Sequence, residues 1–377
     1  GRRRRGANEC SHRAGVGHFL PNEVMSNAAV SRSVTVALLG ALLVVAAGAA
    51  AAQSSGLAFV SDEASHDVSV IDLAKRAVVA TIRLDGRARG IHVSPDNRRV
   101  YVATSDDRPA GESSADAIAV IDIASRRVVA THHIGSDPEQ FAVTPDGRFI
   151  YASNEDGGTA TAIDLQTGKR LASLVVGIEP EGVAVSADGR WIAVTSETSN
   201  SVSIIDATRH KVVDNLLVDL RPRAAAFSPD GSRLYVTAEI GGTLSVIDGK
   251  SHALLATVPI DKGDGKPVGV AVSPDGRRVY VVSGRTGTLS VIDAATNRIA
   301  SVVPVGKRPW GVAVSRDGRF IYTANGLSND VTVVDASNNR VEPTSGRPAS
   351  VGHCPRQLSS ATGGGERSTC SIFPNGR

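Results

Sequence analysis

The residues best suited to chemistry recur in one short pattern, x-Pro-x-Gly, which stands directly before a strand-like segment. Two copies of the pattern carry paired carboxylates, and the copies on either side carry paired guanidinium groups. Arginine forks bind carboxylates and quinone-type anions, whereas paired carboxylates can hold a cation through oxygen ligands. With three glutamates from a second loop series, the candidate ligand-binding residues are Arg87, Arg89, Asp137, Glu139, Glu155, Glu179, Glu181, Glu197, Arg221, Arg223, Glu239, Lys266, Arg308 and Trp310.

Two interpretations of this charged set remain open. In the first, the side chains form a charge-segregated mouth that binds a small ligand or a protein, and Trp310 stacks on a ring. In the second, they form a salt-linked rim that separates closely packed loops, and Trp310 only packs. Both interpretations need the copies to lie side by side, which depends on the fold.

A repeat of about 42 residues provides that fold. An Ile/Val-Asp dipeptide recurs from Asp72 to Asp335, and a Ser/Thr-x-Asp-Gly/Asn turn recurs from Asp96 to Asp317 with the same spacings. Each unit contains several short alternating strands separated by turns, which is typical of one propeller blade. The sequence predicts an all-β, seven-bladed β-propeller of four-stranded blades over residues 53–340.

The ring is expected to close incompletely at the C-terminus. The chain enters at the second strand of a blade, LAFVSDE, so the first blade needs an inner strand from elsewhere. Residues 341–377 are rich in Gly, Ser and Pro and show no alternation, which predicts an irregular, disordered tail. We therefore expect the outer strand of the last blade and the inner strand of the first to be missing or poorly formed. A tolerated variant closure is the alternative.

The N-terminal flank has the pattern of an export signal. Residues 25–52 run from the single Met through a short apolar stretch to small residues at 50–52, which predicts a cleaved signal peptide. An uncleaved anchor is the alternative, and residues 1–24 are expected to be an upstream, non-native or disordered segment. We therefore expect a periplasmic or secreted protein with no membrane span after cleavage.

Charge and cysteine content agree with an exported, non-nucleic-acid-binding protein. The whole chain carries a formal charge of +3, but residues 53–340 hold 31 basic and 34 acidic residues. The basic balance belongs to the flanks, so no nucleic acid partner is expected. Residues 53–340 contain no Cys, and the CxxCH motif of a c-type heme is absent from the chain.

Segments such as LYVTAEIGGTLSVIDGKSHALLATVPI closely resemble the YVTN-type β-propeller repeat. In their order, DPEQFAVTPDG, EPEGVAVSADG, VDNLLVDLRPRAAAF and RPWGVAV are similar to the seven-repeat exported propeller associated with pyrroloquinoline quinone (PQQ)-dependent alcohol catabolism. This resemblance implies a non-enzymatic accessory protein that binds a small molecule, or a periplasmic dehydrogenase or transport component, on its variable face. We expect a monomer. No motif supports a metal or cofactor, PQQ and Ca²⁺ included, so none is expected.

Two other functions stay open. A lactonase-like hydrolase on a seven-bladed propeller needs a His, a Glu and an Arg that converge at the channel, and His92 with Glu139 and Arg89 is the candidate set. A cell-surface interaction module is the other alternative. We assign no catalytic residues, because no nucleophile elbow, P-loop, dinucleotide fingerprint or zinc-protease motif occurs.

Overall fold

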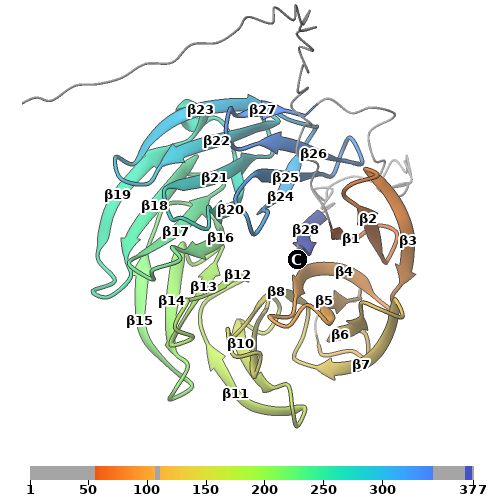
Figure 1. Cartoon of the computed structure of the whole chain (residues 1–377). Coiled ribbons are helices and arrows are strands. Elements are labelled where there is room, and N and C mark those ends of the chain that lie inside the picture. Colours follow the sequence, from red (N-terminus) through yellow and green to blue (C-terminus); the bar gives the residue numbers. More distant parts are fainter. Residues whose placement is uncertain (1–55, 107–110, 343–369, 376–377) are drawn as a thin grey trace, which may run out of the picture. The chain divides into compact units, whose positions relative to one another are not determined.

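The computed structural model describes residues 56–106 and 111–342, and the backbone of residues 370–375. These residues form seven four-stranded antiparallel sheets, arranged as the blades of a ring around a central channel (Figure 1). The predicted seven-bladed, all-β fold is confirmed. In the described part of the chain the one helical turn is the 3-10 turn η1 (Asp261–Gly263).

Each blade contributes one strand to each of four concentric positions. From blade 1 to blade 7, the inner strands are β28 (Cys370–Asn375), β4 (Arg87–Val93), β8 (Pro138–Val143), β12 (Pro180–Val185), β16 (Pro222–Phe227), β20 (Pro267–Val272) and β24 (Pro309–Val314). The second strands are β1 (Leu57–Asp62), β5 (Arg99–Ser105), β9 (Phe149–Asn154), β13 (Trp191–Ser196), β17 (Arg233–Ala238), β21 (Arg278–Ser283) and β25 (Phe320–Asn325). The third strands are β2 (Asp67–Asp72), β6 (Ala117–Asp122), β10 (Thr159–Asp164), β14 (Ser201–Asp206), β18 (Thr243–Asp248), β22 (Thr288–Asp293) and β26 (Asp330–Asp335). The outer strands are β3 (Ala77–Arg83), β7 (Arg127–His133), β11 (Lys169–Val175), β15 (Lys211–Leu217), β19 (Leu254–Pro259), β23 (Arg298–Pro304) and β27 (Arg340–Val341).

The repeated aspartates hold the turns on one face. The Ser94 hydroxyl donates to Asp96 at 2.6 Å, and Asp96 accepts the Arg98 backbone N–H at 3.1 Å. At the other repeated turn, Asp72 accepts the Lys75 backbone N–H at 2.9 Å. These side chains accept hydrogen bonds from backbone N–H groups that have no backbone partner in a tight turn. The two sets of repeated aspartates therefore stabilise the turns.

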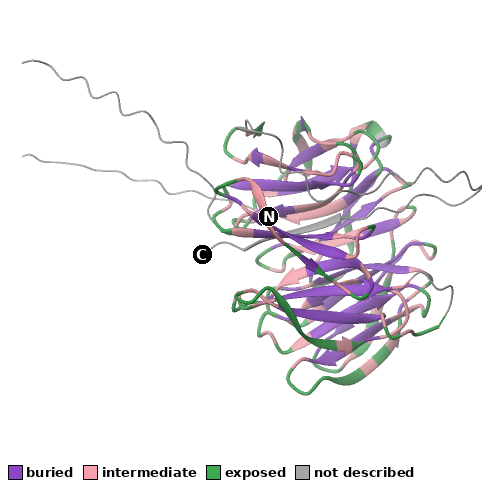
Figure 2. Cartoon of the chain, turned by 90° about the vertical axis from the view of Figure 1, so that its right-hand side faces the viewer, coloured by how far each residue is buried: buried purple, intermediate pink, exposed green. Residues whose placement is uncertain are grey.

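The core lies between neighbouring blades. The repeated tyrosines fill one slot of the second strand, and Tyr151, Tyr235, Tyr280 and Tyr322 are at most 2% exposed. Tyr151, for example, packs with Val183 and Ile192 of the next blade. Burial is therefore concentrated in the second and third strands, while the outer strands and loops are exposed (Figure 2).

The expectation that the ring closes incompletely, without an inner strand in blade 1, is wrong. Strand β28 pairs antiparallel with β1, from Leu57 opposite Asn375 to Asp62 opposite Cys370, and supplies the inner strand of blade 1. The backbone makes this ladder whatever the side-chain pattern, so residues 370–375 close the ring without any marker of the repeat. The outer strand of blade 7 is short, as expected, since β27 has two residues.

Several expectations fall outside the described residues. The upstream segment (1–24), the signal peptide (25–52) and residues 343–369 of the tail are among them. Within the described residues, no helix has the length and apolar character needed to cross a membrane.

Candidate functional site

One backbone arrangement places the charged side chains at the channel mouth. The residue before the x-Pro-x-Gly proline adopts a left-handed conformation, with φ of 45° at Asp137 and 54° at Glu179. Its carbonyl accepts the first N–H of the neighbouring loop, as from Glu155 to Asp137 at 2.9 Å and from Glu197 to Glu179 at 2.8 Å. The same contact recurs in blades 5, 6 and 7. Both loop series of a blade therefore present their side chains together.

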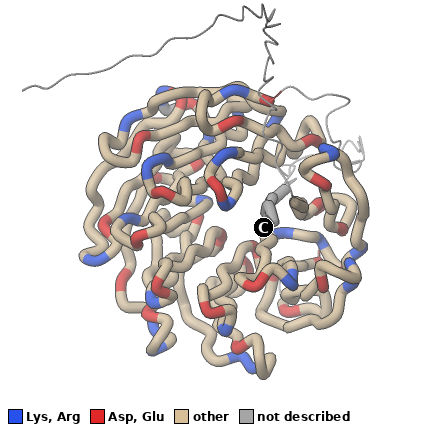
Figure 3. Tube along the Cα trace, viewed as in Figure 1, with Lys and Arg blue, Asp and Glu red and all other residues tan. Residues whose placement is uncertain are grey.

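Side chains at this shared position divide the mouth into two regions. The residue after the second strand is acidic in blades 1 to 5 and glycine in blades 6 and 7, in the order Glu63, Asp106, Glu155, Glu197, Glu239, Gly284 and Gly326. We call the first region the acidic arc: Glu63, Arg87, Arg89, Asp137, Glu139, Glu155, Glu179, Glu181, Glu197, Arg221, Arg223 and Glu239. The second is the basic notch: Lys266, Val268, Gly284, Arg308, Trp310 and Gly326. Charged positions surround the channel in Figure 3.

Arg89 is the centre of the first half of the acidic arc. Its guanidinium lies 2.7 Å from Glu139, 3.6 Å from Glu63 and 3.7 Å from Asp137, and the side chain is only 3% exposed. Arg87, on the same strand β4, lies 3.3 Å from Glu63 and 3.2 Å from Asp137. Three blades are joined by these contacts.

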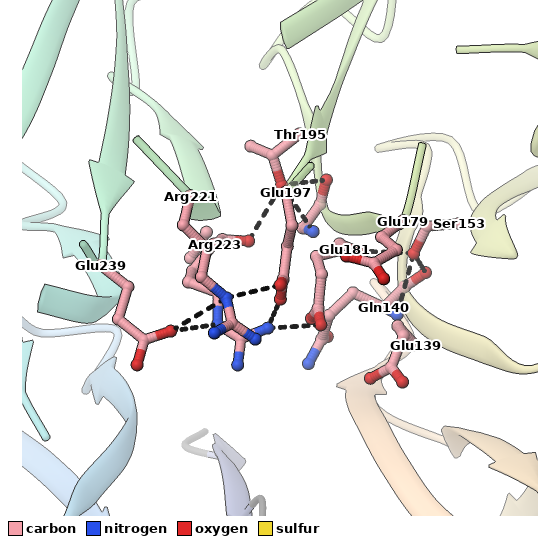
Figure 4. Close-up of polar contacts among 12 residues, drawn as sticks. Glu139, Gln140, Ser153, Glu179, Glu181, Thr195, Glu197, Arg221, Arg223 and Glu239 are labelled. Atoms are coloured by element: carbon pink, nitrogen blue, oxygen red, sulfur yellow. Dashed lines mark hydrogen bonds and ion pairs between the residues drawn. The ribbon is translucent and has the colours of Figure 1, made fainter. Parts of the chain in front are cut away.

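Arg223 is the centre of the second half. It contacts Glu181 at 2.5 Å, Glu239 at 3.1 Å and also Glu197 (Figure 4). Arg221 reaches Glu197 at 2.6 Å from a more exposed position. In the acidic arc, the observed contacts agree with the interpretation of the charged residues as a salt-linked rim.

The acidic arc holds more carboxylates than guanidinium groups. Burial raises the pKa of Glu139 well above its usual value, the nearby Glu181 carboxylate raises it further, and Arg89 opposes the shift. Burial also raises the pKa of Asp137, against the effect of Arg89. Asp137, Glu139 and Glu155 each offer an oxygen within 4.8 Å of the others, a spacing that a hard cation can use. Arg89 already forms ion pairs with two of these three residues.

Below the mouth, the channel contains a cavity of about 150 Å³. Six inner strands line it, and its polar lining includes His92, Gln140, Glu181 and Arg223. Neighbouring inner strands approach closely here, since a Cβ on Gly269 would lie 2.6 Å from the Trp310 carbonyl oxygen. This close approach explains the glycine of the x-Pro-x-Gly pattern.

His92 has the character of a neutral imidazole. Burial lowers its pKa to about 4, although a hydrogen bond with the Phe141 backbone opposes the shift. Its ring lies edge-on to the Phe141 ring, with centroids 4.9 Å apart. In the set considered for a lactonase, Arg89 and Glu139 do meet, and His92 lies on the cavity wall near the same strands.

The basic notch combines an aromatic ring with cationic groups. The guanidinium carbons of Arg223 and Arg308 lie 4.9 and 5.6 Å from the Trp310 ring centroid. Lys266 is exposed, and Trp310 borders the cavity. Because Gly284 and Gly326 replace the glutamates of the acidic arc, this side of the mouth carries net positive charge.

All fourteen predicted residues lie in these loops and their adjoining strands, eleven of them in blades 2 to 5. Sequence reasoning missed Glu63, although it occupies the position of Glu155 in the first repeat. It also missed Gln140 on the cavity wall. Extending the repeat alignment to blade 1 finds the first, and the second stands out because it replaces the glycine of the x-Pro-x-Gly pattern.

Comparison with known proteins gives a family and a fold. The family described as "Cytochrome D1 heme domain" matches residues 111–221 and 230–357. No curated protein sequence matches the chain. The match corrects the expectation that no cofactor is involved, because the family is defined by a heme domain. That expectation relied on a missing CxxCH motif, which reports only covalent attachment.

Two solved structures have the same fold. Hydrazine synthase of Kuenenia stuttgartiensis is 23% identical with a TM-score of 0.66, over 74% of this chain and 91% of that one. A protein of unknown function from Desulfotomaculum acetoxidans is 18% identical with a TM-score of 0.65, over 79% of this chain and 98% of the other. At these identities the similarity establishes the propeller fold.

Proposed function

The chain belongs to the cytochrome D1 heme domain family, and from that premise we propose that the basic notch binds a planar, conjugated ligand bearing carboxylates. The observation that carries the proposal is the pair of Trp310, which borders the channel cavity, and Arg308, whose guanidinium carbon lies 5.6 Å from the ring centroid. Guanidinium groups bind carboxylates, and both guanidinium planes and indole rings pack on conjugated rings. Heme is the ligand that the family description names, and PQQ is the one implied by the resemblance to YVTN propellers.

The residue types near the cavity suit a heme, because they include an imidazole and cationic side chains. His92 stays neutral near pH 7 because its pKa is about 4, so one ring nitrogen can act as a metal ligand while the other bonds the Phe141 backbone. Arg308 and Lys266 can pair with the heme carboxylates. A bound heme supplies a redox-active iron.

The volume of the cavity limits how such a ligand is held. At about 150 Å³ it is smaller than the roughly 300–1,000 Å³ of pockets that enclose a whole cofactor or drug-sized molecule. A heme or PQQ therefore needs the open mouth as well as the cavity. In the basic notch, Val268 and Trp310 line the cavity, while Lys266 and Arg308 lie in the loops that precede β20 and β24.

Absorbance titration of the full chain with hemin and with PQQ tests the proposal. We expect at least one of them to bind, and Lys266→Ala with Arg308→Ala to weaken binding about tenfold. His92→Ala should change the spectrum of bound heme but leave PQQ binding within about twofold. Absence of binding by both ligands below roughly 100 μM would contradict the proposal.

We also propose that the protein is exported, monomeric and acts by binding rather than by catalysis, as an accessory to PQQ-linked alcohol oxidation. Support comes from the export-like sequence at 25–52, and proteins with this domain are typically periplasmic. In the acidic arc, Glu139 is engaged by Arg89 at 2.7 Å. Hydrolysis of a lactone panel that Glu139→Ala abolishes would replace this role with that of a hydrolase.

A further inference from the structure

Five large apolar side chains are exposed on the channel-mouth face, outside the basic notch. Val175 and Leu217 are each 81% exposed at the ends of β11 and β15. Ile178, Leu220 and Ile240 are 61%, 51% and 56% exposed in the loops that follow β11, β15 and β17. We call these five residues the apolar rim.

Comparison among the repeats shows that the fold does not require them. The position of Val175 and Leu217 is Arg83 in blade 1, His133 in blade 2, Pro259 in blade 5 and Pro304 in blade 6. The position of Ile178 and Leu220 is Gly, Ser or Lys in the other copies of the loop. Only two consecutive copies are apolar at both positions.

Hydrogen bonds between neighbouring loops make the apolar rim continuous. The Ile178 N–H donates to Ser199 at 2.8 Å, and the next residue of that loop, Asn200, accepts the Val218 N–H at 3.0 Å. Leu220 in turn accepts the Gly241 N–H at 3.0 Å, which places Ile240 beside it. Clustered exposed apolar residues with a polar border mark interaction sites.

The border of the apolar rim is acidic. Glu179 and Asp219 lie in the same loops and Asp156 in the loop that follows β9, and within the described residues none of the three forms an ion pair. Glu179 accepts the Thr198 hydroxyl at 2.5 Å, and Asp219 accepts the Thr243 hydroxyl at 2.9 Å. A second copy of this chain would bring like charges together, whereas a basic partner would neutralise them.

We propose that the apolar rim is a docking surface for a protein segment with apolar anchor side chains flanked by Lys or Arg. The anchors would cover Ile178 and Leu220, and the basic side chains would pair with Glu179 and Asp219. The proposal goes beyond ligand binding at the basic notch and depends on different residues.

Two labelled helical peptides of equal length, one of Leu and Lys and one of Leu and Glu, test the docking surface by fluorescence anisotropy. We expect the full chain to bind the Leu/Lys peptide and not the Leu/Glu peptide. Ile178→Ser with Leu220→Ser should weaken binding at least about tenfold. Val128→Ser with Val129→Ser, which removes exposed apolar groups from β7, is the matched control and should leave affinity within about twofold.

Charge removal supplies the second arm. Glu179→Gln with Asp219→Asn should weaken binding of the Leu/Lys peptide and reduce its dependence on salt. Equal affinity for the two peptides, or an equal loss in the β7 control, would overturn the proposal. So would a dimer, or binding to phosphatidylcholine vesicles, that the Ile178→Ser, Leu220→Ser variant abolishes. None of these changes touches Lys266 or Arg308, so the outcome is separate from that of the ligand titration.

Discussion

The acidic arc and the basic notch share one backbone arrangement but differ in the residue that follows the second strand of each blade. In both, a left-handed residue before proline accepts a hydrogen bond from the neighbouring loop, at 2.9 Å for Asp137 and 3.0 Å for Arg308. In the acidic arc the loop residue is a glutamate that contacts an arginine of an adjacent blade. In the basic notch it is glycine, so the cationic side chains face the mouth without that carboxylate.

This difference separates stability from binding. A buried guanidinium enclosed by carboxylates is costly to disturb, because removal of one partner leaves the others desolvated and unpaired. A half-exposed cation next to an aromatic ring contributes little to folding but retains interaction capacity for an anion. The repeat places a loop residue at the same point of each blade, and whether that residue is acidic or glycine decides whether the nearby cation forms an ion pair within the protein or faces the channel mouth.

The largest expected effect is on the acidic arc. Arg223→Ala leaves Glu181, Glu197 and Glu239 without their shared partner, and should lower the free energy of unfolding by roughly 3–5 kcal/mol. Arg308→Ala in the basic notch should lower it by less than about 1 kcal/mol. Urea unfolding followed by circular dichroism measures both. Equal losses would mean that the two regions do not differ in this way.

Acid should destabilise the channel wall at β4, where His92 lies. His92 has a pKa of about 4 in the folded chain and an ordinary value near 6.5 when unfolded, so its contribution is full above pH 6.5. Between pH 6.5 and 4 the unfolded chain binds a proton that the folded chain does not bind. The free energy of unfolding should fall by up to about 3 kcal/mol over this range, and by less if water in the channel screens the charged imidazole. Thermal melts of the protein and of His92→Gln should diverge as the pH falls. Parallel curves would contradict this.

Gly284→Glu places the residue of the acidic arc in the basic notch. The nearest atom to a new Cβ is the Pro309 carbonyl oxygen at 3.7 Å, an ordinary contact, so stability should change by less than about 1 kcal/mol. Ligand affinity should fall about tenfold, because the carboxylate opposes an anionic ligand. Unchanged affinity in the absorbance titration would show that net charge at this position does not control binding.

The smallest effect is expected at Glu139. Because its pKa is raised in the folded chain, its contribution to stability is present at low pH and is lost as pH rises through the folded value. Glu139→Gln lacks this titrating group, so its free energy of unfolding should fall less than that of the natural chain as the pH rises from about 4.5 to 8. Urea unfolding across this pH range measures both, and equal pH dependence of the two chains would contradict this.

The sequence predicted the blades because period and turn residues agree in every copy, and it placed the charged loops at one mouth for the same reason. It could not predict β28, since residues 370–375 pair with β1 but carry no marker of the repeat. Nor could it predict that Arg223 faces three glutamates from two blades, because that depends on the angle between blades. The expectation of no cofactor was wrong because the sequence was searched only for short motifs, and the family match to a heme domain depends on no such motif.

Calorimetry on matched variants tests most directly whether the two regions divide binding and stability. The full chain, Lys266→Ala with Arg308→Ala, and Arg221→Ala are each titrated with hemin and with PQQ. We predict that the double variant of the basic notch binds about tenfold more weakly, while Arg221→Ala in the acidic arc keeps its affinity within about twofold. An equal or greater loss in Arg221→Ala would contradict the assignment of the ligand to the basic notch.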